Sequence, residues 1–145
     1  MLTLHHLNDS RSQKILWLLE ELELPYEIVS YQRDPVTQMG PPALKALHPL
    51  GKSPVLEDDG LKVVESAAIV EYLCARHAPQ MIPDVGADAH VRHMELMHFA
   101  EGSAMTPILL NLYVSRLGDA GAPLHPRIKD ELHSHFSYMN SLVRP

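Results

Sequence analysis

The hydrophobic pattern of this chain changes about half-way along its 145 residues. In the first half, short alternating segments typical of strands lie between segments whose apolar residues recur at helical spacing. From residue 90 onward, every apolar repeat has helical spacing. Such a chain is expected to form a sheet with helices packed on it, followed by a region that is entirely helical.

The first half predicts the order strand, helix, strand, short helix, strand, strand and helix. The predicted strands cover residues 2–5, 26–31, 55–57 and 61–64; the predicted helices run from a cap at residues 8–10 to about 24, over 43–47 and over 65–77. A strand-helix-strand unit favours parallel strands with a right-handed crossover. The predicted fold class is α/β: a thioredoxin-like domain over residues 1–78, with order βαβ-α-ββα, a four-stranded mixed sheet and helices on both faces.

The second half predicts a partial all-helical domain. Residues 79–89 contain Pro79, Pro83 and Gly86, which indicate a linker. Residues 90–145 then carry two apolar stripes, and Pro107 is expected to kink the first helix. The stripes are Val91, Met94, Met97, Met105, Ile108, Leu109 and Leu112, then Ile128, Leu132, Phe136, Met139 and Leu142. Two helices cannot bury both stripes by themselves, so we expect a truncated chain whose stripes need partners.

Composition excludes several classes of protein. The net charge of −6 argues against a nucleic-acid binder, which normally has a basic face. The single cysteine, Cys74, excludes an internal disulfide and favours a reducing compartment. With no signal peptide at the start and no apolar run of about 20 residues, we expect a cytoplasmic protein that is not embedded in a membrane. Among ten histidines there is one Glu-x-x-His spacing, Glu95 to His98, so no metal site is expected.

Three segments then carry a resemblance to a known family. They are HLNDSRSQKILWLLEEL at residues 6–22, HPLGKSPVL at 48–56 and ESAAIVEYL at 65–73. Each is a weak motif alone, but in this order and spacing they resemble glutathione transferases, in particular bacterial and fungal members of the serine type. The resemblance covers the first domain closely and the later helices loosely. The family's helical domain normally continues through further helices, including a Ser/Thr-x-x-Asp capping box, and no such helix is found here.

The resemblance implies an enzyme that conjugates the thiol of glutathione, its cosubstrate, to small hydrophobic electrophiles, and that works as a homodimer. Ser10 is the candidate catalytic residue. A free thiol has a pKa of about 8.5, and a hydroxyl at a helix N-terminus can lower it by donating a hydrogen bond to the thiolate. Ser12 is the rival, Arg11 is an alternative source of positive charge, and a simple helix cap is the alternative role for Ser10.

Five further residues are the candidate glutathione-binding group. By resemblance, Ser53 and Pro54 form a cis-proline step at which Ser53 pairs with the cysteinyl unit, and Lys52 meets the glycine carboxylate. Glu65 and Ser66 open a helix, where Ser66 and backbone N–H groups can bind the γ-glutamyl carboxylate and Glu65 its ammonium group. The alternatives are an ordinary proline turn with a solvated lysine, and simple helix capping.

Two other functions use the same scaffold. One is a non-catalytic or regulatory glutathione-transferase-like binding protein, and the other is a glutathione-dependent peroxidase. A dithiol mechanism is disfavoured because Cys74 has no Cys-x-x-Cys partner, and we expect it to be a small buried side chain.

Overall fold

The structure is a computed structural model that describes residues 1–143. The chain forms two compact units, Met1–Ile82 and Pro83–Pro145, and each is described here by itself. The division falls inside the segment that the sequence predicts as a linker.

The first unit is built on a four-stranded mixed sheet with the order β2-β1-β3-β4. Its strands are β1 (Leu2–Leu7), β2 (Tyr26–Tyr31), β3 (Val55–Asp58) and β4 (Leu61–Val64). The central strand β1 is parallel to β2 and antiparallel to β3, and β4 is antiparallel to β3. The predicted thioredoxin-like topology is therefore confirmed.

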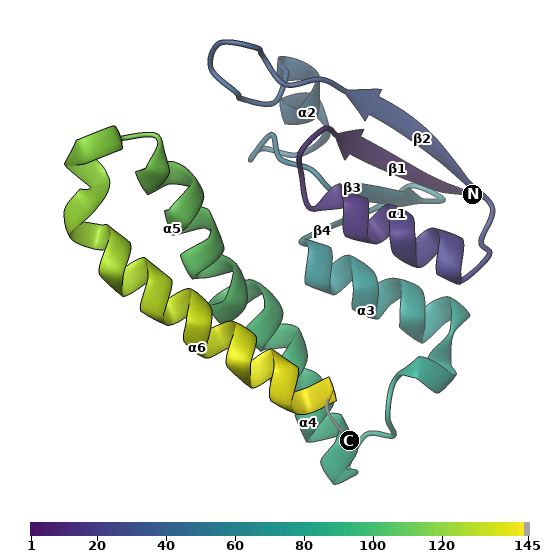
Figure 1. Cartoon of the computed structure of the whole chain (residues 1–145). Coiled ribbons are helices and arrows are strands. Elements are labelled where there is room, and N and C mark those ends of the chain that lie inside the picture. Colours follow the sequence, from purple (N-terminus) through teal and green to yellow (C-terminus); the bar gives the residue numbers. More distant parts are fainter. Residues whose placement is uncertain (144–145) are drawn as a thin grey trace. The chain divides into compact units, whose positions relative to one another are not determined.

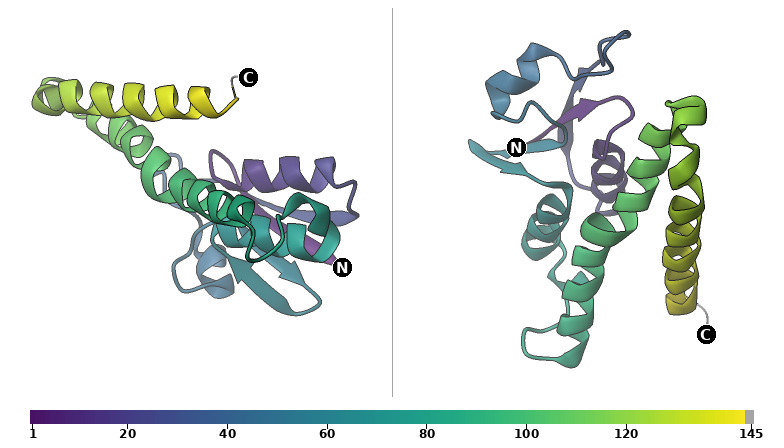
Figure 2. Two further views of the ribbon diagram at one scale, coloured as in Figure 1. Left: turned by 90° about the horizontal axis from the view of Figure 1, so that it is seen from below. Right: turned by 90° about the vertical axis from the view of Figure 1, so that its left-hand side faces the viewer.

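Helices cover both faces of this sheet. They are α1 (Ser12–Glu21), α2 (Pro42–Leu47) and α3 (Ser66–His77), followed by the short 3-10 helix η1 (Pro79–Met81). Helices α1 and α3 lie side by side on one face (Figure 1), and α2 lies on the other (Figure 2). The main core lies between the sheet and the first pair of helices. It consists of Leu2, Leu4, Ile15, Leu19, Leu56, Ile69 and Leu73, each at most 5% exposed.

Some bounds differ from the prediction for identifiable reasons. Strand β1 extends beyond residue 5 because its pairing with β2 continues to Leu7 opposite Tyr31. Helix α1 begins at Ser12 and ends at Glu21. Shortly after its end, Glu23 takes a φ of 50°, a left-handed conformation that does not continue a helix.

Cys74 is buried as expected, and this burial raises the pKa of its thiol.

In the described part of the second unit, all the regular secondary structure is helical. It consists of α4 (Asp88–His98), the π-helical turn η2 (Phe99–Ala104), α5 (Met105–Ser115), the 3-10 helix η3 (Gly118–Leu124) and α6 (His125–Val143). Helices α5 and α6 pack along each other (Figure 1).

No helix among residues 1–143 combines the length and the apolar character that crossing a membrane requires.

Pro107 interrupts the regular α-helical bonding just before its own position. Its ring nitrogen has no hydrogen to donate, so the chain cannot keep an unbroken α-helical ladder there. The interruption takes the form of η2, which ends two residues before Thr106. Thr106 Oγ1 donates to the Gly102 carbonyl at 2.8 Å, which gives that carbonyl a side-chain partner.

Candidate active site

A cavity of about 90 Å³ in the first unit is lined by most of the predicted site residues. Its lining comes from three segments of the chain: the start of α1, the loop that enters β3, and the junction of β4 and α3. The lining residues are Arg11, His48, Leu50, Lys52, Ser53, Pro54, Val64, Glu65 and Ser66.

The sheet topology explains why these segments meet. Strand β3 runs opposite to β1, so the start of β3 lies beside the end of β1, with Val55 paired to His5. Strand β4 runs opposite to β3, so its end returns to the same edge, with Val64 paired to Val55. The loop after β1, the loop before β3 and the start of α3 therefore share one end of the sheet.

The loop that enters β3 is bonded firmly to β1. The Ser53–Pro54 peptide bond is cis, as the resemblance implies. The Ser53 hydroxyl donates to the carbonyl of His5 at 2.8 Å and accepts the backbone N–H of Leu7 at 3.2 Å. These two bonds fix the position of Ser53 relative to the segment that carries Ser10.

The two candidate serines occupy different environments. Ser12 is completely buried, and its Oγ lies 2.7 Å from that of Ser10 and 2.8 Å from Nδ1 of His6. Ser10 is only half-buried, and its hydroxyl lies 3.4 Å from that of Ser53. Neither serine lines the cavity itself, and of the two hydroxyl groups the one on Ser10, next to the lining residue Ser53, is the less buried.

Glu65 and Ser66 stand at the start of α3 as predicted, in an unusual backbone conformation. Glu65 has a φ of 67°, which a residue with a side chain rarely adopts. Such conformations cost about 1–3 kcal/mol and are concentrated at functional sites. Ser66, the first residue of α3, is 4% exposed. The N-terminal backbone N–H groups of a helix attract anions.

Charged side chains of both signs line the cavity, which suits a ligand that itself carries both signs. Arg11 and Lys52 are cationic and Glu65 is anionic. Sequence reasoning gave no role to the other lining residues His48, Leu50 and Val64. His48 and Leu50 belong to the same sequence motif as Lys52. Their position in that motif could have indicated that they line the site.

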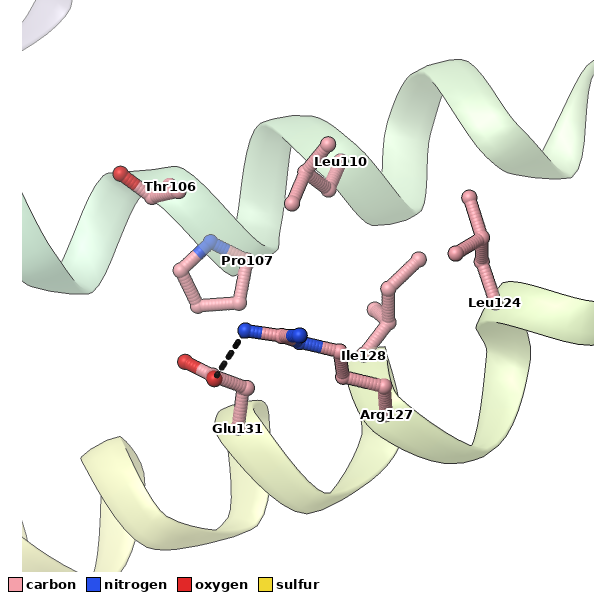
Figure 3. A pocket seen from close by; sticks show the side chains of 7 residues that line it. All are labelled: Thr106, Pro107, Leu110, Leu124, Arg127, Ile128 and Glu131. Carbon is pink, nitrogen blue, oxygen red and sulfur yellow. Dashed lines mark ion pairs between the residues drawn. The ribbon is translucent and has the colours of Figure 1, made fainter.

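A larger cavity of about 290 Å³ lies within the second unit, between α5 and α6 (Figure 3). Its lining is mainly apolar and includes Pro107, Leu110 and Ile128. At its edge Arg127 and Glu131 form an ion pair at 3.7 Å. None of the predicted site residues lines it, and convergent polar groups, which mark a specific binding site, are few there.

Within the part of the chain that is described, no cluster of three or more His, Cys, Asp or Glu is placed to hold a metal ion.

Residues 1–75 match the family model for the N-terminal domain of glutathione S-transferases. The chain belongs to the glutathione S-transferase family. It is 49% identical over 106 residues to glutathione S-transferase 3 of Schizosaccharomyces pombe, an alignment that covers 72% of this chain and 43% of that transferase. It is 33% identical over 150 residues to glutathione S-transferase 1 of Saccharomyces cerevisiae, with coverage of 94% and 63%. This transferase chain therefore spans less than two thirds of the length of either relative.

A solved structure supports the transferase fold. The crystal structure of a glutathione transferase from Phanerochaete chrysosporium with oxidized glutathione matches 98% of this chain and 67% of that one, with a TM-score of 0.81 and 23% identity. The match includes the helical unit as well as the sheet unit, so the likeness in fold extends beyond residues 1–75.

Proposed function

We propose that this protein is a glutathione transferase that conjugates the thiol of glutathione to small hydrophobic electrophiles. The observation that carries the proposal is the meeting of three sequence motifs, far apart in the chain, around one cavity of the first unit. Residues 11, 52–54 and 65–66 line it together, and the Ser10 hydroxyl lies beside Ser53.

Glutathione offers two carboxylates, an ammonium group and a thiol, and each has a proposed partner. The start of α3 with Ser66 would bind the γ-glutamyl carboxylate, and Glu65 would accept from the ammonium group. Lys52 would pair with the glycine carboxylate. The backbone of Ser53 would pair with the cysteinyl unit as an added strand does. A cavity of about 90 Å³ is too small to enclose a tripeptide, so glutathione would lie across its mouth.

Ser10 is proposed to stabilise the thiolate. The burial of Ser12 supports Ser10 over its rival, because a completely buried hydroxyl cannot reach a ligand without local rearrangement. A hydrogen bond to a charged group contributes about 1.5–3 kcal/mol, which corresponds to a thiol pKa lowered by about one to two units. Arg11, at the cavity wall, would add positive charge.

The proposed reaction is a nucleophilic substitution or addition by sulfur. With an aryl halide, the thiol proton passes to solvent, the thiolate forms a bond to the ring carbon and the halide leaves with the electron pair of the broken bond. The protein's part is to bind the tripeptide and to hold it as the thiolate, which is the nucleophilic form. The choice of electrophile, a homodimer and a cytoplasmic location stay predictions.

The test is Ser10→Ala, followed by ultraviolet absorbance of the thiolate during a pH titration of bound glutathione. We expect the thiol pKa of bound glutathione to rise by about one to two units, and conjugation of a model aryl halide near neutral pH to fall about 10- to 100-fold. Ser30→Ala, which changes an exposed serine of β2, is the matched control and should leave both unchanged. Normal conjugation by Ser10→Ala would refute Ser10 as the thiol activator.

The same titration separates the other functions on this scaffold. If wild-type protein binds glutathione but the thiol ionises as it does in free solution, a non-catalytic binding protein is the better description. If the thiolate forms but peroxide is turned over much faster than the aryl halide, the peroxidase is favoured.

A further inference from the structure

A chain of hydrogen bonds links Ser10 to His6, a residue of β1 that carries no part of the proposed function above. The Oγ atoms of Ser10 and Ser12 lie 2.7 Å apart, and Ser12 Oγ lies 2.8 Å from Nδ1 of His6. Both are distances of well-formed hydrogen bonds. Because Ser12 is completely buried, protein groups take the place of water as its partners.

The single proton of the Ser12 hydroxyl sets the direction of this chain. A hydroxyl donates one hydrogen bond and accepts two. If Nδ1 of His6 carries a hydrogen, it donates to Ser12, and Ser12 is free to donate to Ser10. If Nδ1 carries none, Ser12 donates to His6, and Ser10 has to donate to Ser12. The third neighbour of Ser12 Oγ, the Leu7 carbonyl, is a weaker competitor at 3.3 Å.

The two directions have opposite consequences for Ser10. Its Oγ also accepts the backbone N–H of Ser12 at 3.2 Å. In the first direction Ser12 supplies both hydrogen bonds that the Ser10 oxygen can accept, and the Ser10 proton points outward. Its protein partner there is Ser53 Oγ at 3.4 Å, a long contact that a ligand can replace. In the second direction the Ser10 proton points inward, and it cannot be donated to a thiolate.

We propose that His6 carries a hydrogen on Nδ1 and, through Ser12, keeps the hydroxyl proton of Ser10 directed at the thiol of glutathione. The proposal rests on the proposed function, in which Ser10 is the donor to the thiolate. His6 is thus a positioning residue that acts through Ser12. Its charge does not matter, because the neutral Nδ1–H form and the imidazolium both donate from Nδ1. Each bond of such a chain also polarises the next and strengthens the last one.

The first experiment uses the free protein, so its result does not depend on glutathione. Long-range proton–nitrogen NMR spectra distinguish a protonated from an unprotonated Nδ1. Because the chain has ten histidines, the His6 signals are assigned by their loss in His6→Asn. We expect Nδ1 of His6 to be protonated. A neutral His6 ring with its hydrogen on Nε2 would overturn the proposal even in a protein that activates glutathione normally.

The second experiment measures the thiol pKa of bound glutathione in variants of the chain. His6→Leu should raise it by about one pH unit, because Ser10 can then donate its proton inward to Ser12. Ser12→Ala should raise it by a similar amount, because the Ser10 oxygen loses the hydrogen bond that polarises its own O–H. His6→Asn should restore most of the wild-type value, because its amide N–H can replace Nδ1–H. His77→Leu, at the exposed end of α3, is the control and should behave as wild type.

The outcomes separate the two proposals. If the thiol pKa in His6→Leu equals that of wild type, or if His6→Asn is no better than His6→Leu, the role of His6 is refuted while the proposed function stands. If wild-type protein leaves the thiol pKa at the value of free glutathione, the proposed function fails, and with it the action of His6 on a thiolate. The spectra then still decide the direction of the chain.

Discussion

The sheet unit and the helical unit use their apolar side chains differently. In the first unit, residues from β1, β3, α1 and α3 form one core whose members are at most 5% exposed. In the described part of the second unit, α4 has no buried residue, and α5 and α6 bury only Pro107, Val114 and Ile128. Apolar residues of its predicted stripes remain open to solvent, among them Leu112 at 45%, Phe136 at 52% and Met139 at 43%.

This difference shows where precise geometry is available for chemistry. A site needs side chains held within a fraction of an ångström, and supporting layers of packed residues provide this. The cavity with Ser53, Glu65 and Ser66 lies at one end of the sheet of the first unit, next to strands whose position the core fixes. Substitutions in both units can test this contrast.

The most direct test removes one leucine from each unit. Leu4→Ala deletes a completely buried side chain of the first core and should cost about 3–5 kcal/mol. Leu112→Ala deletes a side chain that is 45% exposed and should cost about 1 kcal/mol or less. Urea unfolding, combined with amide hydrogen exchange that reports each unit separately, measures both costs. Equal costs would mean that the helical unit is as tightly packed as the sheet unit.

The helical unit has one close contact that would sharpen the comparison. A Cβ at Gly121 would lie 2.5 Å from the carbonyl oxygen of Val114 and 2.8 Å from its Cγ1. Gly121→Ala should therefore force the backbone apart and cost about 1–3 kcal/mol. Gly102→Ala is the matched control, since a Cβ there meets nothing within 4 Å and alanine favours helix by about 1 kcal/mol.

Thermal unfolding of both alanine variants checks this prediction. Gly121→Ala is expected to melt below wild type, and Gly102→Ala at or above it. A wild-type melting temperature for Gly121→Ala would show that η3 and α5 can separate at little cost.

Substitutions of Glu65 test whether the strained backbone just before α3 serves glutathione binding. Glu65→Gly relieves the positive φ and should stabilise the protein by about 1 kcal/mol while weakening glutathione binding. Glu65→Gln keeps the strained backbone and removes only the charge. It should weaken binding without a gain in stability. Calorimetry gives the affinity and thermal melting the stability, and a loss of stability in Glu65→Gly would contradict the idea.

The smallest effect concerns His5, which is 6% exposed on β1. Burial lowers the pKa of His5 below its ordinary 6.5, although the nearby Glu57 carboxylate partly opposes this. Below pH 6.5 the unfolded chain therefore binds more protons at this site than the folded one, so the free energy of unfolding falls as the pH falls. His5→Phe should lose this part of the pH dependence.

Urea midpoints at pH 7.5 and 5.5, for wild type and His5→Phe, measure that contribution. The other titrating groups are common to both proteins. The change in midpoint between the two pH values is therefore compared between wild type and His5→Phe, and the difference isolates His5. Identical changes would show that His5 accepts a proton in the folded protein as easily as in the unfolded one.

Much of the fold followed from local patterns. Alternation, β-branched and aromatic residues, and a hairpin turn signal identified the four strands, and Tyr26–Tyr31 and Leu61–Val64 have the predicted bounds. The element ends were less predictable, because pairing with β2 lengthens β1 and a left-handed residue at Glu23 follows the end of α1. A kink at Pro107 stays a prediction, and the π-helical turn over Phe99–Ala104 was not predicted, since the form of an interruption depends on the neighbouring turns.

The element order and the three motifs that identify the family could be predicted from the sequence, because both depend on residues close together in the chain. Which groups meet in space depends on the packed fold. Ser10 and Ser53 are 43 residues apart in sequence, and sheet pairing brings their hydroxyl groups to 3.4 Å. The packed fold also buries Ser12 completely, unlike Ser10, and brings Nδ1 of His6 to 2.8 Å from the Ser12 hydroxyl. No local pattern encodes these relations, because burial and long-range contact arise only when the strands have paired and the core has closed.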